Sequence, residues 1–286
     1  MKPLLSWYGG KQRMVSKLLP LIPEHKVYCE PFSGGAALFF AKDRVIPGNR
    51  DHYREVLNDT NHELVNFYEV VKTRRKEFLY RLKGYCYSEY WYGFFKDRKD
   101  TLENPVLRAV GFYIRIMMAF AAQQDGGFAF GKQSQNNPVK YRNKLADIDR
   151  KIDRLQDAHI FYRDALDIIQ RFDTPDTFFY CDPPYPGTQQ GAYSGYTQQD
   201  FEKLLDILKQ CKGRFLLSCY HNDSVPSDWV RYEFKSLCSS SNTSKGGHRK
   251  ETTEVVWTNF KCDKDFIPFQ EKEKVSRQSN QLRLAI

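Results

Sequence analysis

Four residues, Asp182-Pro183-Pro184-Tyr185, have the types and spacing of a site for chemistry on an aromatic amine. They follow Thr177 to Cys181, a short apolar and aromatic run that is typical of a buried strand in a parallel sheet. The two prolines must end this strand, because proline lacks the backbone N–H that a central strand donates. The four residues are therefore expected at the carboxyl edge of a sheet, where open α/β folds bind their ligands.

The same residue types fit methylation of that amine. Its lone pair is delocalised into the aromatic ring, and an aspartate with a pKa of about 3.9 is too weak a base to deprotonate it. Asp182 and the carbonyl of Pro183 can instead accept both N–H bonds and leave the lone pair free, and the fixed φ of Pro183 aims this carbonyl. Tyr185 offers a ring on which a base that has left the duplex can stack. The alternative is that the four residues form only a structural turn.

A glycine-rich loop near the amino terminus indicates a nucleoside site. Lys26 to Cys29 predicts a strand, residues 30 to 35 a tight loop with paired glycines, and Ala36 to Phe40 the start of a helix. Glycine lets the backbone of such a loop approach a ligand closely. The spacings of the dinucleotide and P-loop fingerprints are absent, which favours a ligand without a pyrophosphate.

Two acidic residues follow further predicted strands. Asp59 ends the segment Glu55 to Asp59, at the place where the second strand of a nucleotide-binding unit presents a carboxylate to a ribose. Asp164 ends the segment Ile160 to Asp164 in the same manner. Each has a structural alternative: Asp59 could cap a helix from Asn61 to Lys72, and Asp164 could belong to a turn.

In their order along the chain, these motifs resemble the Dam family (D12 class) of adenine-specific DNA methyltransferases. The resemblance covers most of the chain and rests on Trp7 to Lys11, Glu30 to Gly35, Asn58-Asp59, Asp182 to Tyr185 and Glu254 to Phe260. It implies an α/β fold, with a mostly parallel, seven-stranded, Rossmann-like methyltransferase sheet and an inserted, largely helical target-recognition domain. It also implies transfer of a methyl group from S-adenosylmethionine to the N6 amine of a flipped-out adenine in double-stranded DNA.

The resemblance also implies roles for single residues. The catalytic group would be Asp182, Pro183, Pro184 and Tyr185. The contacts to S-adenosylmethionine would come from the residues that the loops place around it, namely Trp7, Lys11, Phe32, Gly34, Asp59, Asp164 and Asp182.

The positive charge is concentrated in one segment. The chain carries 44 Lys and Arg against 35 Asp and Glu, and residues 72 to 163 hold 19 against 10 of them, so the whole surplus of 9 lies there. Residues 100 to 124 and 142 to 156 read as helices, and the glycine- and amide-rich residues 125 to 138 between them read as a loop or hairpin. We interpret residues 71 to 155 as a DNA target-recognition domain inserted into a catalytic domain of residues 1 to 70 and 156 to 286.

Cationic and amide side chains there can contact phosphates and base edges. A second basic stretch, residues 239 to 250, reads as a flexible loop that is either a free hairpin tip or a DNA contact. The candidate DNA-binding residues are Arg115, Gln123, Lys132, Gln133, Gln135, Arg142, Lys245 and Arg249.

The composition bears on the cellular compartment and on metal binding. Seven cysteines at irregular spacing suit a reducing compartment better than a disulfide framework, and no histidine has metal-ligand spacing, so we expect no metal. The sequence contains neither a signal peptide nor a membrane-spanning run, so we expect a cytoplasmic enzyme of bacterial or phage origin that acts as a monomer.

Other functions remain open from the sequence. The same chemistry could act on an RNA adenine or on the N4 amine of cytosine, although Asp182 favours DNA adenine because relatives with those substrates commonly carry asparagine or serine there. A non-catalytic DNA-binding relative is a further alternative. The sequence assigns no recognition site in DNA.

Overall fold

The computed structural model describes residues 1–43, 53–123, 126–131, 136–186, 195–219, 222, 224–237 and 251–262. Its centre is a seven-stranded sheet with the strand order β3-β2-β1-β4-β5-β7-β6. The first five strands of this order are parallel, and β7 pairs antiparallel with both β5 and β6. The strands are β1 (Val27–Glu30), β2 (Arg54–Asn58), β3 (Ala158–Phe161), β4 (Thr177–Cys181), β5 (Arg214–Cys219), β6 (Val230–Leu237) and β7 (Glu251–Thr258). The expected mostly parallel, Rossmann-like sheet is confirmed.

Successive side chains of a strand point to opposite faces of the sheet, so the apolar core is divided between the two faces. Tyr28 lies beside Phe178 in register, and both side chains join the larger apolar core, whereas Cys29 and Phe179, one residue further along, join the smaller one. All four are fully buried, because strands in the middle of a parallel sheet are covered on both faces.

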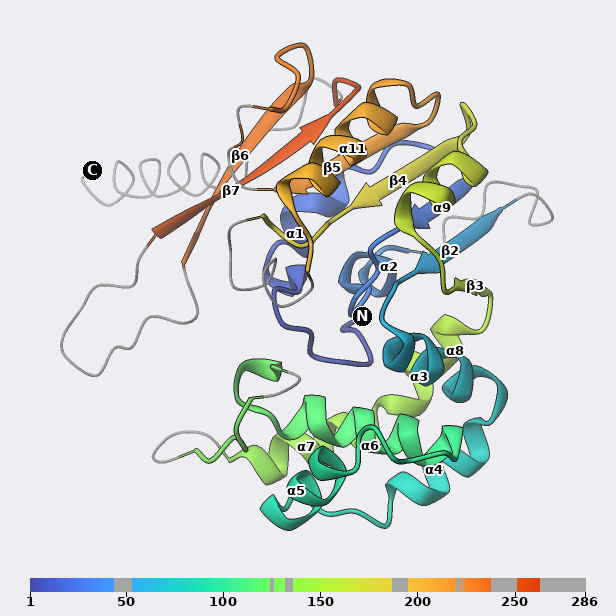
Figure 1. Cartoon of the computed structure of the whole chain (residues 1–286), viewed down its shortest axis with the longest axis vertical. Helices are drawn as coiled ribbons and strands as arrows, with labels where there is room; N and C mark the ends of the chain where they lie inside the picture. Colours follow the sequence, from blue (N-terminus) through green and yellow to red (C-terminus); the bar gives the residue numbers. More distant parts are fainter. Residues whose placement is uncertain are drawn as a thin grey trace, which may run out of the picture.

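Helices cover the sheet on its two faces (Figure 1). They are η1 (Lys11–Arg13), α1 (Val15–Leu18), η2 (Leu19–Leu21), α2 (Ala37–Ala41), α3 (His62–Thr73), α9 (Ala165–Phe172) and α11 (Gln198–Lys209). The start of α3 is fixed by Asn61, whose side chain accepts the backbone N–H of Leu64 at 3.0 Å. A capping box of Thr197 and Asp200 fixes the start of α11.

The basic segment forms the helical layer below the sheet in Figure 1. Its elements are α4 (Arg75–Leu82), α5 (Glu89–Asp97), α6 (Pro105–Met118), η4 (Phe120–Ala122), α7 (Asn137–Ala146) and α8 (Ile148–Leu155). The most buried is α6, which packs on α3 through Phe112 and Tyr113 against Phe67. The core of this layer is therefore continuous with the core on one face of the sheet.

Two boundaries differ from the sequence-based expectation. Residues 142–156 form the end of α7 and all of α8 rather than one helix, since α7 begins earlier, where the Asn136 side chain caps it, and the chain breaks at Asp147. β3 ends at Phe161 rather than at Asp164, because Asp164 caps α9 by accepting the N–H of Leu166 at 2.8 Å.

A buried ion pair joins the helical layer to the sheet. Arg154 of α8 donates two hydrogen bonds of 2.6 Å to the carboxylate of Glu55 on β2, and Lys42 lies 2.7 Å from the same group. All three residues are buried, and the guanidinium stacks on Phe39 at 3.7 Å. Burial alone would raise the pKa of Glu55, but the bonds from Arg154 and the charge of Lys42 outweigh it and lower that pKa.

No helix in the described part of the chain is long and apolar enough to cross a membrane.

Candidate active site

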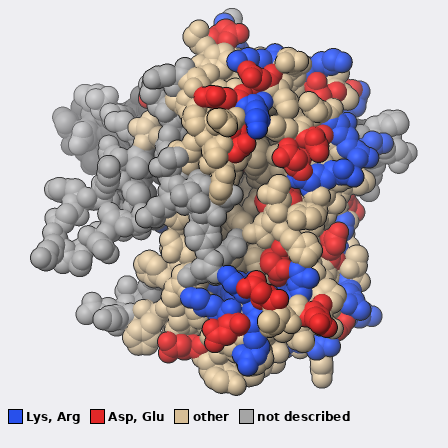
Figure 2. Space-filling view, in the orientation of Figure 1, with Lys and Arg blue, Asp and Glu red and all other residues tan. Residues whose placement is uncertain are grey.

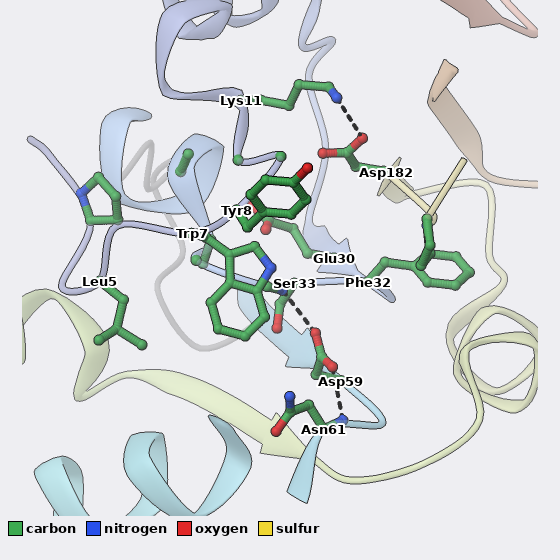
Figure 3. A pocket seen from close by; sticks show the side chains of 18 of the residues that line it. Leu5, Trp7, Tyr8, Lys11, Glu30, Phe32, Ser33, Asp59, Asn61 and Asp182 are labelled. Atoms are coloured by element: carbon green, nitrogen blue, oxygen red, sulfur yellow. Dashed lines mark hydrogen bonds and ion pairs between the residues drawn. The ribbon is translucent and has the colours of Figure 1, made fainter. Parts of the chain in front are cut away.

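A cavity of about 1180 Å³ lies at the carboxyl edge of the parallel strands. Its walls come from four regions: the amino-terminal segment, the loops after β1, β2 and β3, the residues after β4, and the helical layer. Figure 3 shows Lys11 and Asp182 at one end of the view, Asp59 and Asn61 at the other, and Trp7 and Phe32 between them. The residues expected to contact the cofactor line this one cavity, and they are Trp7, Lys11, Phe32, Gly34, Asp59, Asp164 and Asp182.

The loop after β1 is built around Gly34. Its φ of 46° lies in the left-handed region, and a Cβ atom there would come within 2.7 Å of the indole nitrogen of Trp7. Asp59 accepts the N–H of Gly34 at 2.9 Å through one oxygen and the N–H of Asn61 at 2.9 Å through the other. Asp59 therefore holds two loops together at the cavity, and the alternative that it caps α3 is wrong because Asn61 does so.

One buried amide fixes the ends of three strands. Asn58 donates from its side chain to the carbonyls of Pro31 at 2.9 Å and Arg163 at 3.0 Å, and its side-chain oxygen accepts the N–H of Arg163 at 3.0 Å. Its backbone carbonyl accepts the N–H of Ser33 at 2.8 Å. The ends of β1, β2 and β3 are thus tied to a single residue, which sets the spacing of the loops that carry Gly34, Asp59 and Asp164.

The loop after β3 contributes Asp164 to the cavity, where it also caps α9. Asp164 therefore both belongs to the turn before α9 and lines the cavity. Opposite lies an aromatic pair: the ring of Phe32 meets that of Tyr196 edge-on, with centroids 6.1 Å apart. Tyr196 lies beyond the Asp-Pro-Pro-Tyr segment, and no motif in the sequence indicated it.

Asp182 directly follows β4 and is held by a lysine from the amino-terminal segment. The ammonium of Lys11 lies 3.1 Å from Asp182 Oδ1 and 3.7 Å from Glu254 Oε2 on β7. Lys11 is 8% exposed, so this ion pair is shielded from bulk water. Burial raises the pKa of Asp182, and the charge of Lys11 acts against this effect.

Tyr185 lies differently from the expectation. Its side chain is 5% exposed, and the Lys11 ammonium covers the ring face at 4.5 Å from the centroid. Its hydroxyl lies 3.4 Å from Asp182 Oδ1, 3.1 Å from Ser218 Oγ and 3.2 Å from Glu254 Oε2. The expected open ring for stacking a base is wrong for this structure, because the ring is packed inside and its hydroxyl is used for hydrogen bonding.

Pro183 and Pro184 separate Asp182 from Tyr185 along the chain. Pro183 is buried, whereas Pro184 lines the cavity beside Asp182.

Glu30, at the end of β1, is a further acid of the cavity to which sequence reasoning gave no role. It accepts hydrogen bonds from the Tyr28 hydroxyl at 2.6 Å and from the N–H of Phe39 at 2.8 Å. Burial raises the pKa of Glu30 to about 8, against the opposing effect of these hydrogen bonds. Burial thus favours the protonated form of Glu30, whereas Lys11 favours the charged form of Asp182.

The helical layer supplies the outer wall of the cavity. Gln123, one of the candidate DNA-binding residues, lines it, and Arg142 is exposed on α7. Arg115 is 4% exposed within α6, so its guanidinium does not face solvent and its assignment as a DNA contact is corrected. Five candidates lie outside the described residues and keep their standing as predictions: Lys132, Gln133, Gln135, Lys245 and Arg249.

The charge surplus does not form one uniform patch. Figure 2 shows Lys and Arg interleaved with Asp and Glu on the face in view. Several cations of the helical layer are paired within the protein; Arg75, for example, lies 2.6 Å from Asp149 and 2.5 Å from Asp153. The described residues include no group of His, Cys, Asp and Glu that could hold a metal ion.

Comparison with known proteins shows the family to which this chain belongs. The family model of the D12 class N6 adenine-specific DNA methyltransferases matches residues 7–249, which is most of the chain. The chain belongs to that family.

Relatives of this methyltransferase include type II methyltransferases and DNA adenine methylases. The type II methyltransferase M1.LlaDCHI of Lactococcus lactis subsp. cremoris is 27% identical over 285 residues, which cover 91% of this chain and 96% of the relative. The type II methyltransferase M.CviBI of Paramecium bursaria Chlorella virus NC1A is 26% identical over 276 residues, covering 91% and 100%. The DNA adenine methylase of Escherichia coli (strain K12) is 24% identical over 276 residues, covering 89% and 94%.

The methyltransferase is therefore adenine-specific and acts on DNA, as the sequence predicted. The alternatives of an RNA adenine or a cytosine substrate receive no support from these relatives.

Replacing Gly34 by alanine tests the loop around the cofactor site. The Cβ atom would strain a left-handed backbone and press on Trp7, so affinity for S-adenosylmethionine, measured by calorimetry, should fall about ten-fold. Gly93→Ala is the matched control, since a Cβ atom there meets nothing within 4 Å. Unchanged affinity in Gly34→Ala would show that the loop does not contact the cofactor.

Replacing Tyr185 by phenylalanine separates its two possible roles, because it keeps the ring and removes the hydroxyl that joins Asp182, Ser218 and Glu254. We expect the single-turnover rate of methylation to fall about ten-fold, as for loss of a hydrogen bond to a charged group. Tyr113→Phe is the control, since the buried Tyr113 hydroxyl has no hydrogen-bond partner in the described part of the chain. A wild-type rate for Tyr185→Phe would show that these hydroxyl contacts do not contribute to methylation.

Proposed function

We propose that this methyltransferase transfers the methyl group of S-adenosylmethionine to the N6 amine of an adenine flipped out of double-stranded DNA. One observation carries the proposal: the glycine loop with its ribose-type carboxylate and the Asp182 carboxylate line the same cavity. A methyl donor bound by the glycine loop and an amine bound by Asp182 would thus face each other within one cavity.

The residues present fit the cofactor. Asp59 lies at the end of β2, where a carboxylate can accept hydrogen bonds from a ribose diol, and its contact to Gly34 positions the loop beneath the methionine end. Trp7 and Phe32 supply apolar walls for the remainder of the cofactor. When bound, S-adenosylmethionine supplies a methyl group made electrophilic by the positive sulfur.

Asp182 acts on the acceptor. Lys11 and the Tyr185 hydroxyl both approach Oδ1, which leaves Oδ2 as the acceptor for one N–H of the adenine amine. The backbone carbonyl of Pro183 accepts the other N–H. Both hydrogen bonds draw the nitrogen toward a tetrahedral geometry with its lone pair directed at the donor. The amine gives up one proton after the new N–C bond has formed, and Asp182, which accepts one of its N–H bonds, would receive that proton.

The helical layer, residues 71 to 155, would select the DNA site. It supplies one wall of the cavity through Gln123, and the exposed Arg142 lies on the same layer. Amide and guanidinium groups read base edges or hold phosphates. Since one chain supplies both walls of the cavity, the enzyme would act as a monomer.

The experiment is an incubation of the protein with S-adenosylmethionine and double-stranded DNA, followed by digestion and mass spectrometry of the nucleosides. We expect N6-methyldeoxyadenosine at defined sites, with none on single-stranded RNA of the same sequence. Appearance of N4-methyldeoxycytidine, or of no methylated nucleoside, would contradict the proposal.

A further inference from the structure

A lysine-rich corner of the cavity has no role in the chemistry described above. Lys2, Lys144 and Lys151 line the cavity on the side of the helical layer, together with Ser6 and Met117. Lys151 is 6% exposed, and Lys144 is partly buried. Four lysines affect one another here, because Lys2, Lys140 and Lys151 all act on the charge of Lys144.

The partners of Lys144 are neutral. Its ammonium lies 3.0 Å from the Ser6 hydroxyl and 4.0 Å from the Met117 sulfur. Within the described residues no carboxylate lies within ion-pair distance of it. A partly buried ammonium with neutral partners is electrostatically unfavourable unless an anion joins it.

The acid that pairs with Lys151 is already shared. Asp147, between α7 and α8, lies 3.3 Å from the Lys151 ammonium through one oxygen and accepts from Arg150 at 3.1 Å through the other. Asp149 and Asp153 of α8 are bound to Arg75. The corner therefore holds more lysine charge than Asp147 balances, and Lys144 has no carboxylate partner in the described part of the chain.

Burial, and then the charges of Lys151, Lys140 and Lys2, lower the pKa of Lys144 to about 8. An anion placed against it would raise this pKa again. The corner thus has the chemistry of an anion site that is completed when the ligand arrives.

We infer that Lys144, with Ser6 and Lys151, binds a backbone phosphate of the DNA strand that carries the target adenine. This inference rests on the proposed function, because the phosphate belongs to a strand whose base reaches Asp182 in the same cavity. Several amines together suit the diffuse charge of a phosphate better than a base edge, which one bidentate side chain reads. Lys144 is a positioning residue in this scheme, since it touches the substrate strand and not the reacting atoms.

The test compares Lys144→Gln and Lys144→Arg with the wild type, and uses Lys203→Gln, an exposed lysine of α11 outside the helical layer, as control. DNA affinity is measured against salt concentration. For Lys144→Gln we expect affinity about ten-fold lower at low salt and a slope of log affinity against log salt smaller by about 0.9, the value for one lost phosphate contact. Lys144→Arg and Lys203→Gln should keep the wild-type slope.

The pH dependence supplies a second readout. Because the phosphate raises the pKa of Lys144, binding above pH 8 must take up a proton, so wild-type DNA affinity should decline as pH rises through about 8. This component should be absent from Lys144→Arg, which stays charged, and from Lys144→Gln, which cannot titrate. Bound cofactor and an unchanged unfolding midpoint confirm that each variant is folded.

Each remaining outcome overturns the inference. An unchanged salt slope in Lys144→Gln, with methylation by the wild type intact, rejects the phosphate site and leaves the proposed function standing. Loss of S-adenosylmethionine affinity alone would assign the corner to the cofactor carboxylate. An altered methylation site with an unchanged slope would assign it to a base edge, whereas absence of methylation by the wild type would reject the proposed function itself.

Discussion

The position of one carboxylate at the end of a buried strand is the constraint on which this site depends. Asp182 leaves β4 where two prolines end the strand, and Lys11 arrives from the amino-terminal segment to lie 3.1 Å from it. A buried carboxylate without such a partner would be strongly destabilised or protonated, and a protonated group could not accept both the lysine and an amine. Glu254 and Tyr185 complete the arrangement from β7 and from the turn after β4.

The parallel sheet brings the glycine loop, which we propose binds the methyl donor, to the same edge as Asp182. β1, β2, β3 and β4 all end at one edge, and Asn58 ties the first three of these ends together. The glycine loop and the Asp182 carboxylate are therefore positioned by the same backbone ladder. The helical layer is fixed to this ladder by the buried pair of Arg154 and Glu55, so the outer wall of the cavity is held in place relative to Asp182.

The sequence specified the parts of this structure that depend on local patterns. β4 has the predicted bounds because all five of its residues are buried and two prolines follow. The glycine loop and the acids after β2 and β3 were likewise recognisable from the order of the motifs, and the family resemblance implied the seven-stranded sheet.

What the sequence could not specify is which loops meet. Tyr185 looked like a stacking platform, but its contact with Glu254 spans 69 positions and turns the ring inward. Arg115 looked like a DNA-binding cation, but the packing of α6 buries it. The contact between Lys144 and Ser6 spans 138 positions, and no local pattern predicts it.

The central claim is that Asp182 orients and polarises the amine, and the single-turnover methylation rate of Asp182→Ala tests it most directly. The account predicts a rate at least about 100-fold below that of the wild type, because a preorganised electrostatic partner is lost, with DNA affinity unchanged. A rate close to that of the wild type would contradict it.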